Sequence, residues 1–318
     1  MDGTSPDISV VMVSYGSSAH VQTAVAALLA QTEVSLEIIV VDNASPDHDA
    51  DNLTGLPINL VRSEKNLGYG LGINLGAQKA SGKYLCVLNP DVIPPPDCLA
   101  AWLREARKIT STGQKLGCLA PRLTMLNGNP QKSVYAFMTP LNYWSQHSVA
   151  AGALKWIRKR WRGAAPPPTS IPRPVDWVMG AAMLFPREAF EAVSGFSPGY
   201  FLYAEDMDIC RRLKDAGFPT WFTPEVTLPH ALGESSPEPR DVSVERLYRG
   251  LLTFLHQHYT PLRSIPIRAC MVADMVLRII LVAGPAAVLR KEKDFQRLRG
   301  YRRVLQLVMS NGSKLKPE

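Results

Sequence analysis

Residues 8–42 read ISVVMVSYGSSAHVQTAVAALLAQTEVSLEIIVVD, and this stretch decides the fold class. A β-branched run at Ile8–Val13 predicts a strand, an apolar face at His20–Gln31 predicts a helix, and Leu36–Val41 predicts a second buried strand. Two strands that are joined through one helix pair in parallel, with helices covering the sheet. Asp42 follows the second strand directly, at the carboxyl end of the predicted pair.

The alternation of strand and helix continues beyond this unit. We expect a strand at Ile58–Arg62, a helix at Gly70–Ala80, a strand at Tyr84–Leu88 and a helix at Leu99–Lys108. This order predicts an α/β fold with a mainly parallel, Rossmann-like central sheet and helices on both faces. Ligands of such sheets bind beyond the carboxyl ends of the strands, where Ser14, Asp42 and Asp91 stand.

The segment from residue 125 to residue 174 breaks the alternation. Asn127 and Gly128 predict a hairpin, Lys155–Arg162 interleaves tryptophans with basic residues, and Gly163–Pro174 is a proline-rich loop. We interpret the segment as a variable insertion on the side of the acceptor or of a membrane.

Regular structure is predicted again after the insertion. We expect an ordered stretch at Val175–Phe185, helices at Arg187–Val193 and Glu205–Ala216, and a strand at Phe218–Phe222. The remainder reads mainly as helix. The sequence therefore predicts an α/β domain over residues 1–240 and a helical C-terminal region over residues 241–318, which could associate with a membrane interface.

Composition restricts the class of protein. Of 318 residues, 46% are hydrophobic, which is enough for a packed core, and the net charge of +7 suits an anionic partner such as nucleotide phosphate, lipid headgroup or nucleic acid. We expect no nucleic acid, because the basic residues join no recognition motif. The five cysteines form no CxxC pair, which favours a reducing cytoplasm without zinc or disulfides. The N-terminal residues predict no signal peptide.

The C-terminal region carries a mostly apolar run at Met271–Leu289 that includes Asp274 and Arg278. Two charges in such a run argue against a spanning helix and favour an interfacial or core helix. Tryptophan and arginine are typical of membrane interfaces. The arginines concerned are Arg263, Arg268, Arg278, Arg297, Arg299, Arg302 and Arg303. We expect peripheral attachment to the cytoplasmic face of the membrane; a solvated basic helix face is the alternative.

Asp91 stands in KYLCVLNPDVIPPP, residues 83–96, where a buried strand ends at Asn89-Pro90-Asp91. Mg²⁺ and Mn²⁺ bind through few carboxylates together with substrate phosphates, so one carboxylate beyond a strand end suffices if a diphosphate supplies other oxygens. The alternative is an ordinary turn aspartate. His230 is a second candidate ligand for a metal or phosphate, with a structural histidine as its alternative.

The segment Glu205-Asp206-Met207-Asp208 opens a predicted helix. Asp206 shares a helical face with Ile209, Cys210 and Leu213 and should point inward, as a general base must to meet its substrate. Asp208 should form a solvated ion pair with Arg211 and Arg212. The alternative for the three acids is that they complement the helix dipole.

Two further stretches could contact a nucleotide. Asp42 could accept a hydrogen bond from a base N–H, or it or Asn43 could cap its turn. Residues 66–76 read NLGYGLGINLG, whose glycines allow a phosphate-bearing ligand to approach the backbone. A flexible loop is the alternative for that stretch, because its spacing matches neither GxGxxG nor a P-loop.

Together these pieces resemble the family 2 glycosyltransferases with the GT-A fold, and within that family they look most like bacterial rhamnosyltransferases. The matching stretches are ISVVMVSYGS, EIIVVDNAS, NLGYGLGINLGAQKASGKYLCVLNPD, GAAMLFPREAFEAVSGFSPGYFLYAEDMDICRRLKDAGF and PHALGESS. They cover about two thirds of the chain in the order that the family has.

The resemblance implies roles for single residues. Asp42 would contact the nucleotide base, and Asp91 would bind Mg²⁺ or Mn²⁺ at the position of the family's DxD motif. Asp206 would deprotonate the acceptor hydroxyl, and His230 would lie near the metal and the diphosphate. The donor side would be formed by Ser14, Tyr15, Asp42, Asn66, Gly68, Asn74 and Asn89. The sugar and acceptor side would be formed by Trp177, Gly180 and Glu205.

The chain departs from the family pattern at three points. Asn89 replaces the first DxD carboxylate, and Ser14-Tyr15-Gly16 stands where Asn-Tyr-Asn is common. The absence of a QxxRW motif argues against a processive synthase.

The resemblance implies inverting, metal-dependent transfer of a sugar, L-rhamnose from dTDP-rhamnose, to a glycan or polyprenyl-diphosphate-linked saccharide in cell-surface polysaccharide synthesis. The alternatives are transfer of a hexose, N-acetylhexosamine or galactofuranose, and a non-catalytic scaffold that binds sugar nucleotides. The oligomeric state stays open, with a homodimer as one option.

Overall fold

The computed structural model describes residues 5–152, 171–231, 239–289 and 292–310. These fall into two compact units. The sheet unit consists of Met1–Tyr135, Thr169–Pro198 and Glu205–Pro237, and the helical unit consists of Ala136–Pro168, Gly199–Ala204 and Glu238–Glu318. The predicted domain boundary after residue 240 stays a prediction beside this division. The stretch Lys155–Arg162 and all of PHALGESS after Ala231 lie outside the described residues.

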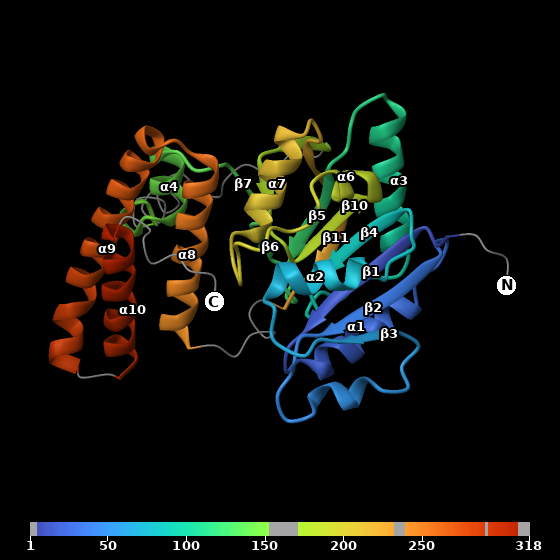
Figure 1. Cartoon of the computed structure of the whole chain (residues 1–318), viewed down its shortest axis with the longest axis horizontal. Helices are drawn as coiled ribbons and strands as arrows, with labels where there is room; N and C mark the ends of the chain where they lie inside the picture. The colour runs from blue at the N-terminus through green and yellow to red at the C-terminus, as the bar shows by residue number, and fades with distance from the viewer. Residues whose placement is uncertain (1–4, 153–170, 232–238, 290–291, 311–318) are drawn as a thin grey trace. The chain divides into compact units, whose positions relative to one another are not determined.

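The sheet unit contains one large sheet with the strand order β3-β2-β1-β4-β10-β5-β11-β8, and β6 pairs with β5 (Figure 1). A short ladder joins β7 to β9. The strands are β1 (Ile8–Ser14), β2 (Leu36–Asp42), β3 (Asn59–Arg62), β4 (Tyr84–Leu88), β5 (Cys118–Thr124), β6 (Pro130–Gln131), β7 (Val134–Tyr135), β8 (Arg173–Val175), β9 (Trp177–Val178), β10 (Ala182–Pro186) and β11 (Thr220–Pro229).

Helices cover both faces of this sheet, as the sequence predicts. The helices of the unit are α1 (Ser18–Leu29), the 3₁₀ turn η1 (Asp49–Leu53), α2 (Tyr69–Ala77), α3 (Cys98–Ser111), α6 (Arg187–Ala192) and α7 (Glu205–Asp215). Side chains of a strand alternate between faces, so Val10 and Met12 of β1 join the core formed with α1 and α3. The neighbouring Val11 and Val13 lie on the opposite face, beneath glycines of α2.

The structure shows one strand direction that the sequence did not predict. β1, β2, β3 and β4 are parallel, but β10 is inserted between β4 and β5 and runs antiparallel to both. The sequence predicts no strand at β5, whose run is interrupted by Pro121, a residue that rarely stands within a sheet. The predicted hairpin at Asn127 and Gly128 is present and joins β5 to β6.

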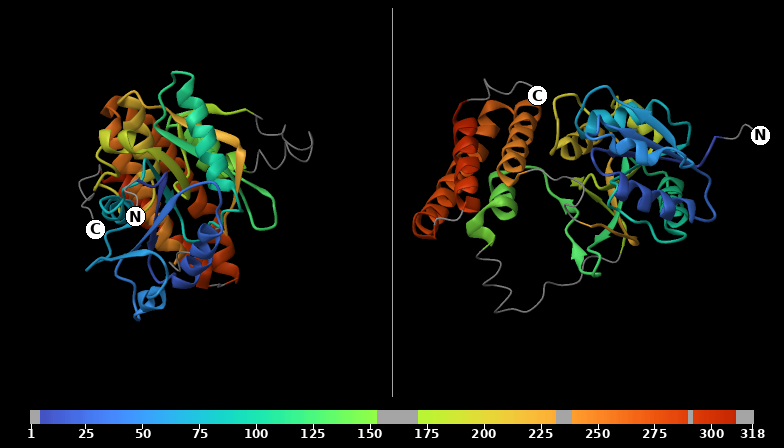
Figure 2. Two further views of the ribbon diagram at one scale, coloured as in Figure 1. Left: turned by 90° about the vertical axis from the view of Figure 1, so that its right-hand side faces the viewer. Right: turned by 90° about the horizontal axis from the view of Figure 1, so that it is seen from below.

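The helical unit confirms the prediction that the C-terminal region is helical. Its helices are α4 (Pro140–His147), α8 (Arg240–His258), α9 (Pro261–Leu289) and α10 (Glu292–Met309), and Figure 2 shows α9 and α10 side by side. Inside the unit, the hydroxyls of Tyr143 and Tyr248 are 2.8 Å apart, and Asp274 is ion-paired with Arg278 at 2.7 Å. Within the described residues, none of the helices combines the length and apolar character that crossing a bilayer requires.

Close packing of α2 on the sheet gives a test of the fold. A Cβ added at Gly76 would lie 2.5 Å from Val11 Cγ1 and 3.0 Å from Val41 Cγ2. We expect Gly76→Ala to lower the free energy of unfolding by about 1–2 kcal/mol, because overpacking outweighs the better helix propensity of alanine. Urea denaturation measures the change. Gly152→Ala is the control, since an added Cβ there meets nothing within 4 Å, and an equal loss in both variants would contradict the packing argument.

Candidate active site

The carboxyl ends of the parallel strands bring polar residues to one edge of the sheet. Ser14 at the end of β1 pairs with Asp42 at the end of β2, and the Asn43 N–H donates to the Ser14 carbonyl at 2.9 Å. The antiparallel β10 begins at this same edge, where the Asn89 N–H donates to the Ala181 carbonyl at 2.9 Å. The segment before β10 therefore reaches the end of β4.

Asp91 and His230, whose metal role stays a prediction, meet at this edge. The Asp91 carboxylate, 1% exposed, lies 3.3 Å from Nε2 of His230, which is 5% exposed. The two chain segments are joined by a bridge between Val92 and His230 and by the Ala231 N–H donating to the Asp91 carbonyl at 3.0 Å. Nδ1 of His230 lies 3.0 Å from Oε1 of Gln131, a residue of the β5–β6 hairpin that fixes the ring and was not predicted.

Asn89 adds a third oxygen or nitrogen donor at the end of β4. Its Oδ1 atom is buried and has no hydrogen-bond partner among the described residues. An amide oxygen, a carboxylate and an imidazole are all suitable ligands for Mn²⁺. The two oxygen ligands also suit Mg²⁺. Among the described residues, no group of three His, Cys, Asp or Glu side chains could hold a metal by itself, so a ligand would have to supply the remaining oxygens.

Asp206, the predicted base, lies at the start of α7 and is held by two backbone donors. The Gly180 N–H donates to Oδ2 at 2.9 Å, and the Met207 N–H donates to Oδ1 at 2.8 Å. Burial raises the pKa of Asp206 to about 6, against the lowering effect of these hydrogen bonds. A Cβ added at Gly180 would lie 3.3 Å from Asp206 Cβ, so a larger residue at position 180 would displace the carboxylate.

Glu205 differs from its neighbour because one of its two carboxyl oxygens lacks a hydrogen-bond donor among the described residues. The residue is 5% exposed, and Oε2 is buried without a partner among the described residues. Burial, followed by the negative charge of Asp206, raises the pKa of Glu205 to about 8. The two adjacent carboxyl groups therefore have different pKa values. At neutral pH Glu205 keeps its proton, and Asp206 is ionised.

Tyr69 is a site residue that the sequence analysis missed. Its hydroxyl donates to the Gly180 carbonyl at 3.0 Å. Its pKa is raised well above the usual value by burial and then by the charges of Glu205, Asp206 and Asp91. These carboxylates therefore act on one hydroxyl, which brings the predicted metal-side and base-side residues into one region. Tyr69 is the first residue of α2 and follows a glycine of the NLGYGLG stretch, and this position was the signal that could have identified it from the sequence.

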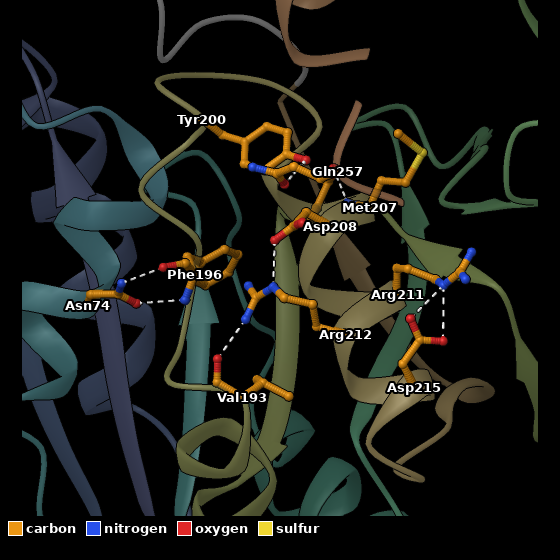
Figure 3. A network of polar contacts seen from close by, with 11 residues as sticks. Asn74, Val193, Phe196, Tyr200, Met207, Asp208, Arg211, Arg212, Asp215 and Gln257 are labelled. Atoms are coloured by element: carbon orange, nitrogen blue, oxygen red, sulfur yellow. Dashed lines mark hydrogen bonds and ion pairs between the residues drawn. The ribbon is translucent and has the colours of Figure 1, made fainter. Parts of the chain in front are cut away.

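Asp208 corrects one prediction. The sequence analysis expects a solvated ion pair with Arg211 and Arg212, but Asp208 is fully buried. Arg212 is ion-paired with it at 2.8 Å and donates to the Val193 carbonyl at 2.6 Å, whereas Arg211 is ion-paired with Asp215 (Figure 3). The loop after α6 packs over this side of α7, and helical periodicity alone cannot reveal such cover.

The end of β2 carries a second polar cluster. Asp42 Oδ1 accepts the Ser45 N–H at 3.0 Å, which is the turn-capping alternative of the sequence analysis. Asn43, the other capping candidate of the sequence analysis, donates to Asn66 Oδ1 at 2.9 Å and to the Gly68 carbonyl at 3.1 Å, and Asn66 in turn accepts the Gly68 N–H. This network fixes the start of α2, and with it Tyr69.

Three predicted donor-side residues have different surroundings. The Asn74 side chain forms two hydrogen bonds with the backbone of Phe196: it donates to the carbonyl at 2.8 Å and accepts from the N–H at 2.9 Å (Figure 3). This contact positions the segment after α6 rather than leaving the amide open to a donor. Ser14 Oγ lies 3.1 Å from Ser17 Oγ, and Tyr15 is 43% exposed. The assignment of all three to the donor stays a prediction.

Trp177, predicted on the acceptor side, stacks on Tyr135 with ring centroids 4.4 Å apart. Burial and the charge of Asp206 raise the pKa of Tyr135 to about 12, so this stacked pair lies within electrostatic reach of the predicted base. Tyr135 is another residue that the sequence analysis missed, because it stands in the insertion and carries no motif.

This fold and this site define the class of GT-A glycosyltransferases. A mannosyltransferase of Pyrobaculum calidifontis, solved with GDP-Man and Mn²⁺, has a similar structure with a TM-score of 0.56 at 14% identity, covering 99% of this chain and 89% of that chain. GalNAc-T7 also has a TM-score of 0.56, at 20% identity, over 80% of this chain and 49% of its own.

Sequence comparison shows which proteins the chain is similar to. Residues 9–159 match the glycosyl transferase family 2 model. The chain is 28% identical over 289 residues to an N-acetylglucosaminyl-diphospho-decaprenol L-rhamnosyltransferase of Mycobacterium tuberculosis, covering 85% of this chain and 91% of the relative. Rhamnosyltransferase WbbL of Escherichia coli is 46% identical over 50 residues, which is 16% of this chain and 19% of WbbL. The chain is similar to members of glycosyltransferase family 2, has the GT-A fold and is a glycosyltransferase.

The raised pKa of Glu205 gives a stability test. A carboxyl whose folded-state pKa is raised contributes stability that is full below its ordinary pKa of 4.5 and is lost as the pH rises through about 8. We expect urea denaturation to show that the wild type loses on the order of 1 kcal/mol or more between about pH 5 and about pH 8.5, relative to Glu205→Gln. Exposed Glu225→Gln is the control. Parallel curves for wild type and Glu205→Gln would contradict the buried, protonated carboxyl.

Proposed function

We propose that this glycosyltransferase transfers L-rhamnose from dTDP-rhamnose, with inversion, to a polyprenyl-diphosphate-linked saccharide in cell-surface polysaccharide synthesis. The observation that carries the glycosyl transfer is the ionised Asp206 carboxylate, oriented by two backbone N–H groups and sharing the Tyr69 environment with Asp91. The sugar and acceptor are supported by the rhamnosyltransferase relative that matches 85% of the chain.

In the proposed reaction, Asp206 accepts the proton of the acceptor hydroxyl as that oxygen attacks the anomeric carbon. The bond between the anomeric carbon and the diphosphate oxygen breaks on the opposite face, and the nucleoside diphosphate leaves with that electron pair. Gly180 and Met207 hold the carboxylate in place during this step. Glu205 keeps its proton at neutral pH, so the acidic pair carries a single negative charge beside the sugar.

Asp91, His230 and Asn89 are the residues that would hold Mg²⁺ or Mn²⁺. Their donor atoms suit such a cation, and the buried Asn89 Oδ1 has no other partner among the described residues. When bound, a divalent cation neutralises charge that develops on a diphosphate leaving group. We further propose that Asp42 and the Asn66–Gly68 turn contact the nucleotide, and that Trp177 and Glu205 border the sugar or acceptor.

A lipid-linked acceptor requires the enzyme to work at a membrane. We propose that it is cytoplasmic and attaches peripherally to the inner face of the cell membrane. The basic balance of the chain, with a net charge of +7, supports attraction to an anionic surface.

Replacing the proposed base tests the reaction directly. We expect Asp206→Asn to lower the rate of transfer about 10²–10⁴-fold while nucleotide binding, measured by calorimetry, stays close to that of the wild type. In the wild type, kcat/KM should rise as the pH rises through about 6, because the base must be ionised. Asp215→Asn, in the same helix, is the control. Turnover of Asp206→Asn near the wild-type rate would exclude this assignment.

Donor and metal are tested together by assaying a panel of nucleotide sugars with EDTA or Mn²⁺. We expect turnover of dTDP-rhamnose above that of the other donors, loss of turnover in EDTA, and recovery with Mn²⁺ or Mg²⁺. Asp91→Asn should need more metal for the same rate, because it replaces the charged ligand by a neutral one. Full activity in EDTA would remove Asp91 from a metal role, and preference for another sugar would revise the donor.

A further inference from the structure

The helical unit exposes an apolar face that none of its described residues covers. Along α9, the α9 stripe consists of Leu262, Ile265, Ala269, Ala273, Val276 and Ile280, and each of these residues is exposed. They recur every three or four residues and therefore share one side of the helix over about 27 Å. Leu262 is 83% exposed and Ile280 is 64% exposed, which is unusual for large aliphatic side chains.

The opposite side of α9 faces the interior of the helical unit. Ile267, Met271 and Met275 are buried there, where α9 packs against α10, α8 and α4. Asp274 is also on this side, where it accepts the Val149 N–H at 3.0 Å and is ion-paired with Arg278. The only acid of α9 thus points away from the α9 stripe. In α9 the charged pair therefore faces the interior of the unit, and an aliphatic side of the helix faces outward.

Charge identifies the kind of surface that fits the α9 stripe. Residues 241–318 contain 14 Lys and Arg but six Asp and Glu, whereas the whole chain contains 35 and 28. The C-terminal region therefore carries more than the entire net positive charge of the protein. On the helical wheel, the exposed Arg263 lies to one side of the stripe near the start of α9, whereas Arg268 donates to the Val308 carbonyl of α10. Like charge disfavours pairing of two copies through this face, whereas an anionic lipid surface attracts it.

The structure also narrows the set of arginines that can meet lipid. Of those that the sequence analysis assigns to the membrane, Arg278, Arg297 and Arg303 lie within 4 Å of acids of the helical unit, namely Asp274, Asp294 and the pair Asp241 and Glu245. Arg263, Arg299 and Arg302 are exposed. Attachment therefore depends on the aliphatic face of α9 as well as on charge.

We infer that the α9 stripe lies in the headgroup region of an anionic membrane, parallel to its surface, with Arg263 beside the headgroups. An amphipathic helix that lies in this way buries its apolar side at the boundary with the acyl chains and does not span the bilayer. The inference deepens the proposed function by naming the surface that brings the enzyme to a lipid-linked acceptor.

Flotation of the full-length chain with vesicles tests the inference. We expect the wild type to float with vesicles of equal parts phosphatidylglycerol and phosphatidylcholine, and to bind pure phosphatidylcholine more weakly. Ile265→Gln/Ile280→Gln should reduce binding about tenfold or more. The control is Leu29→Gln, which changes an exposed aliphatic residue of α1 (54% exposed) in the sheet unit and should bind as the wild type does.

Three results would overturn the inference. They are a wild type that does not float with the anionic vesicles, equal binding by Ile265→Gln/Ile280→Gln and Leu29→Gln, and light scattering in which the wild type is a dimer that Ile265→Gln/Ile280→Gln converts to a monomer with no change in flotation. Flotation needs neither donor nor acceptor. Vesicle binding without turnover of any nucleotide sugar would therefore reject the proposed function and leave the inference standing.

Discussion

The hydrogen bond from the Gly180 N–H to Asp206 is the interaction on which the site depends. Gly180 stands just before β10, so the pairing of β10 with β4 fixes its peptide at the carboxyl edge of the sheet. The Tyr69 hydroxyl donates to the Gly180 carbonyl, so both the N–H and the carbonyl of Gly180 are hydrogen-bonded. Absence of a side chain at Gly180 lets Asp206 approach, so the carboxylate is located by the sheet rather than by a loop.

Burial then sets the charge of this region. Asp206 and Glu205 are neighbours in sequence, but Asp206 receives two backbone N–H groups and Glu205 leaves one oxygen without a partner among the described residues. Hydrogen bonds favour the ionised form of a carboxyl group, and burial without them favours the protonated form. One fold element thereby supplies an anion and an acid side by side. Asp91, paired with His230, adds its charge to the same surroundings of Tyr69.

Much of this arrangement follows from local sequence. The β-branched runs of β1 and β2 and the apolar face of α1 favour a parallel sheet with covered faces, because a continuous apolar run is buried on both sides only when helices cover both faces of its sheet. Asn89 and Asp91 follow a strand, so they had to reach the carboxyl edge. The helix that begins at Glu205 is also readable, since its acids precede an amphipathic run. Tyr69, Tyr135 and Gln131 were missed, because each acts through contacts with residues far away in the chain.

The sequence by itself determined the class of fold, the polar ends of its strands and the helical character of the C-terminal region, since these depend on short-range periodicity. Only the tertiary structure decided that β10 enters antiparallel between β4 and β5, because a strand pattern carries no direction. It also decided that Asp208 is buried with Arg212 and that the aliphatic side of α9 faces outward. Burial is a property of what packs against a residue, and helical spacing fixes only which residues share a side.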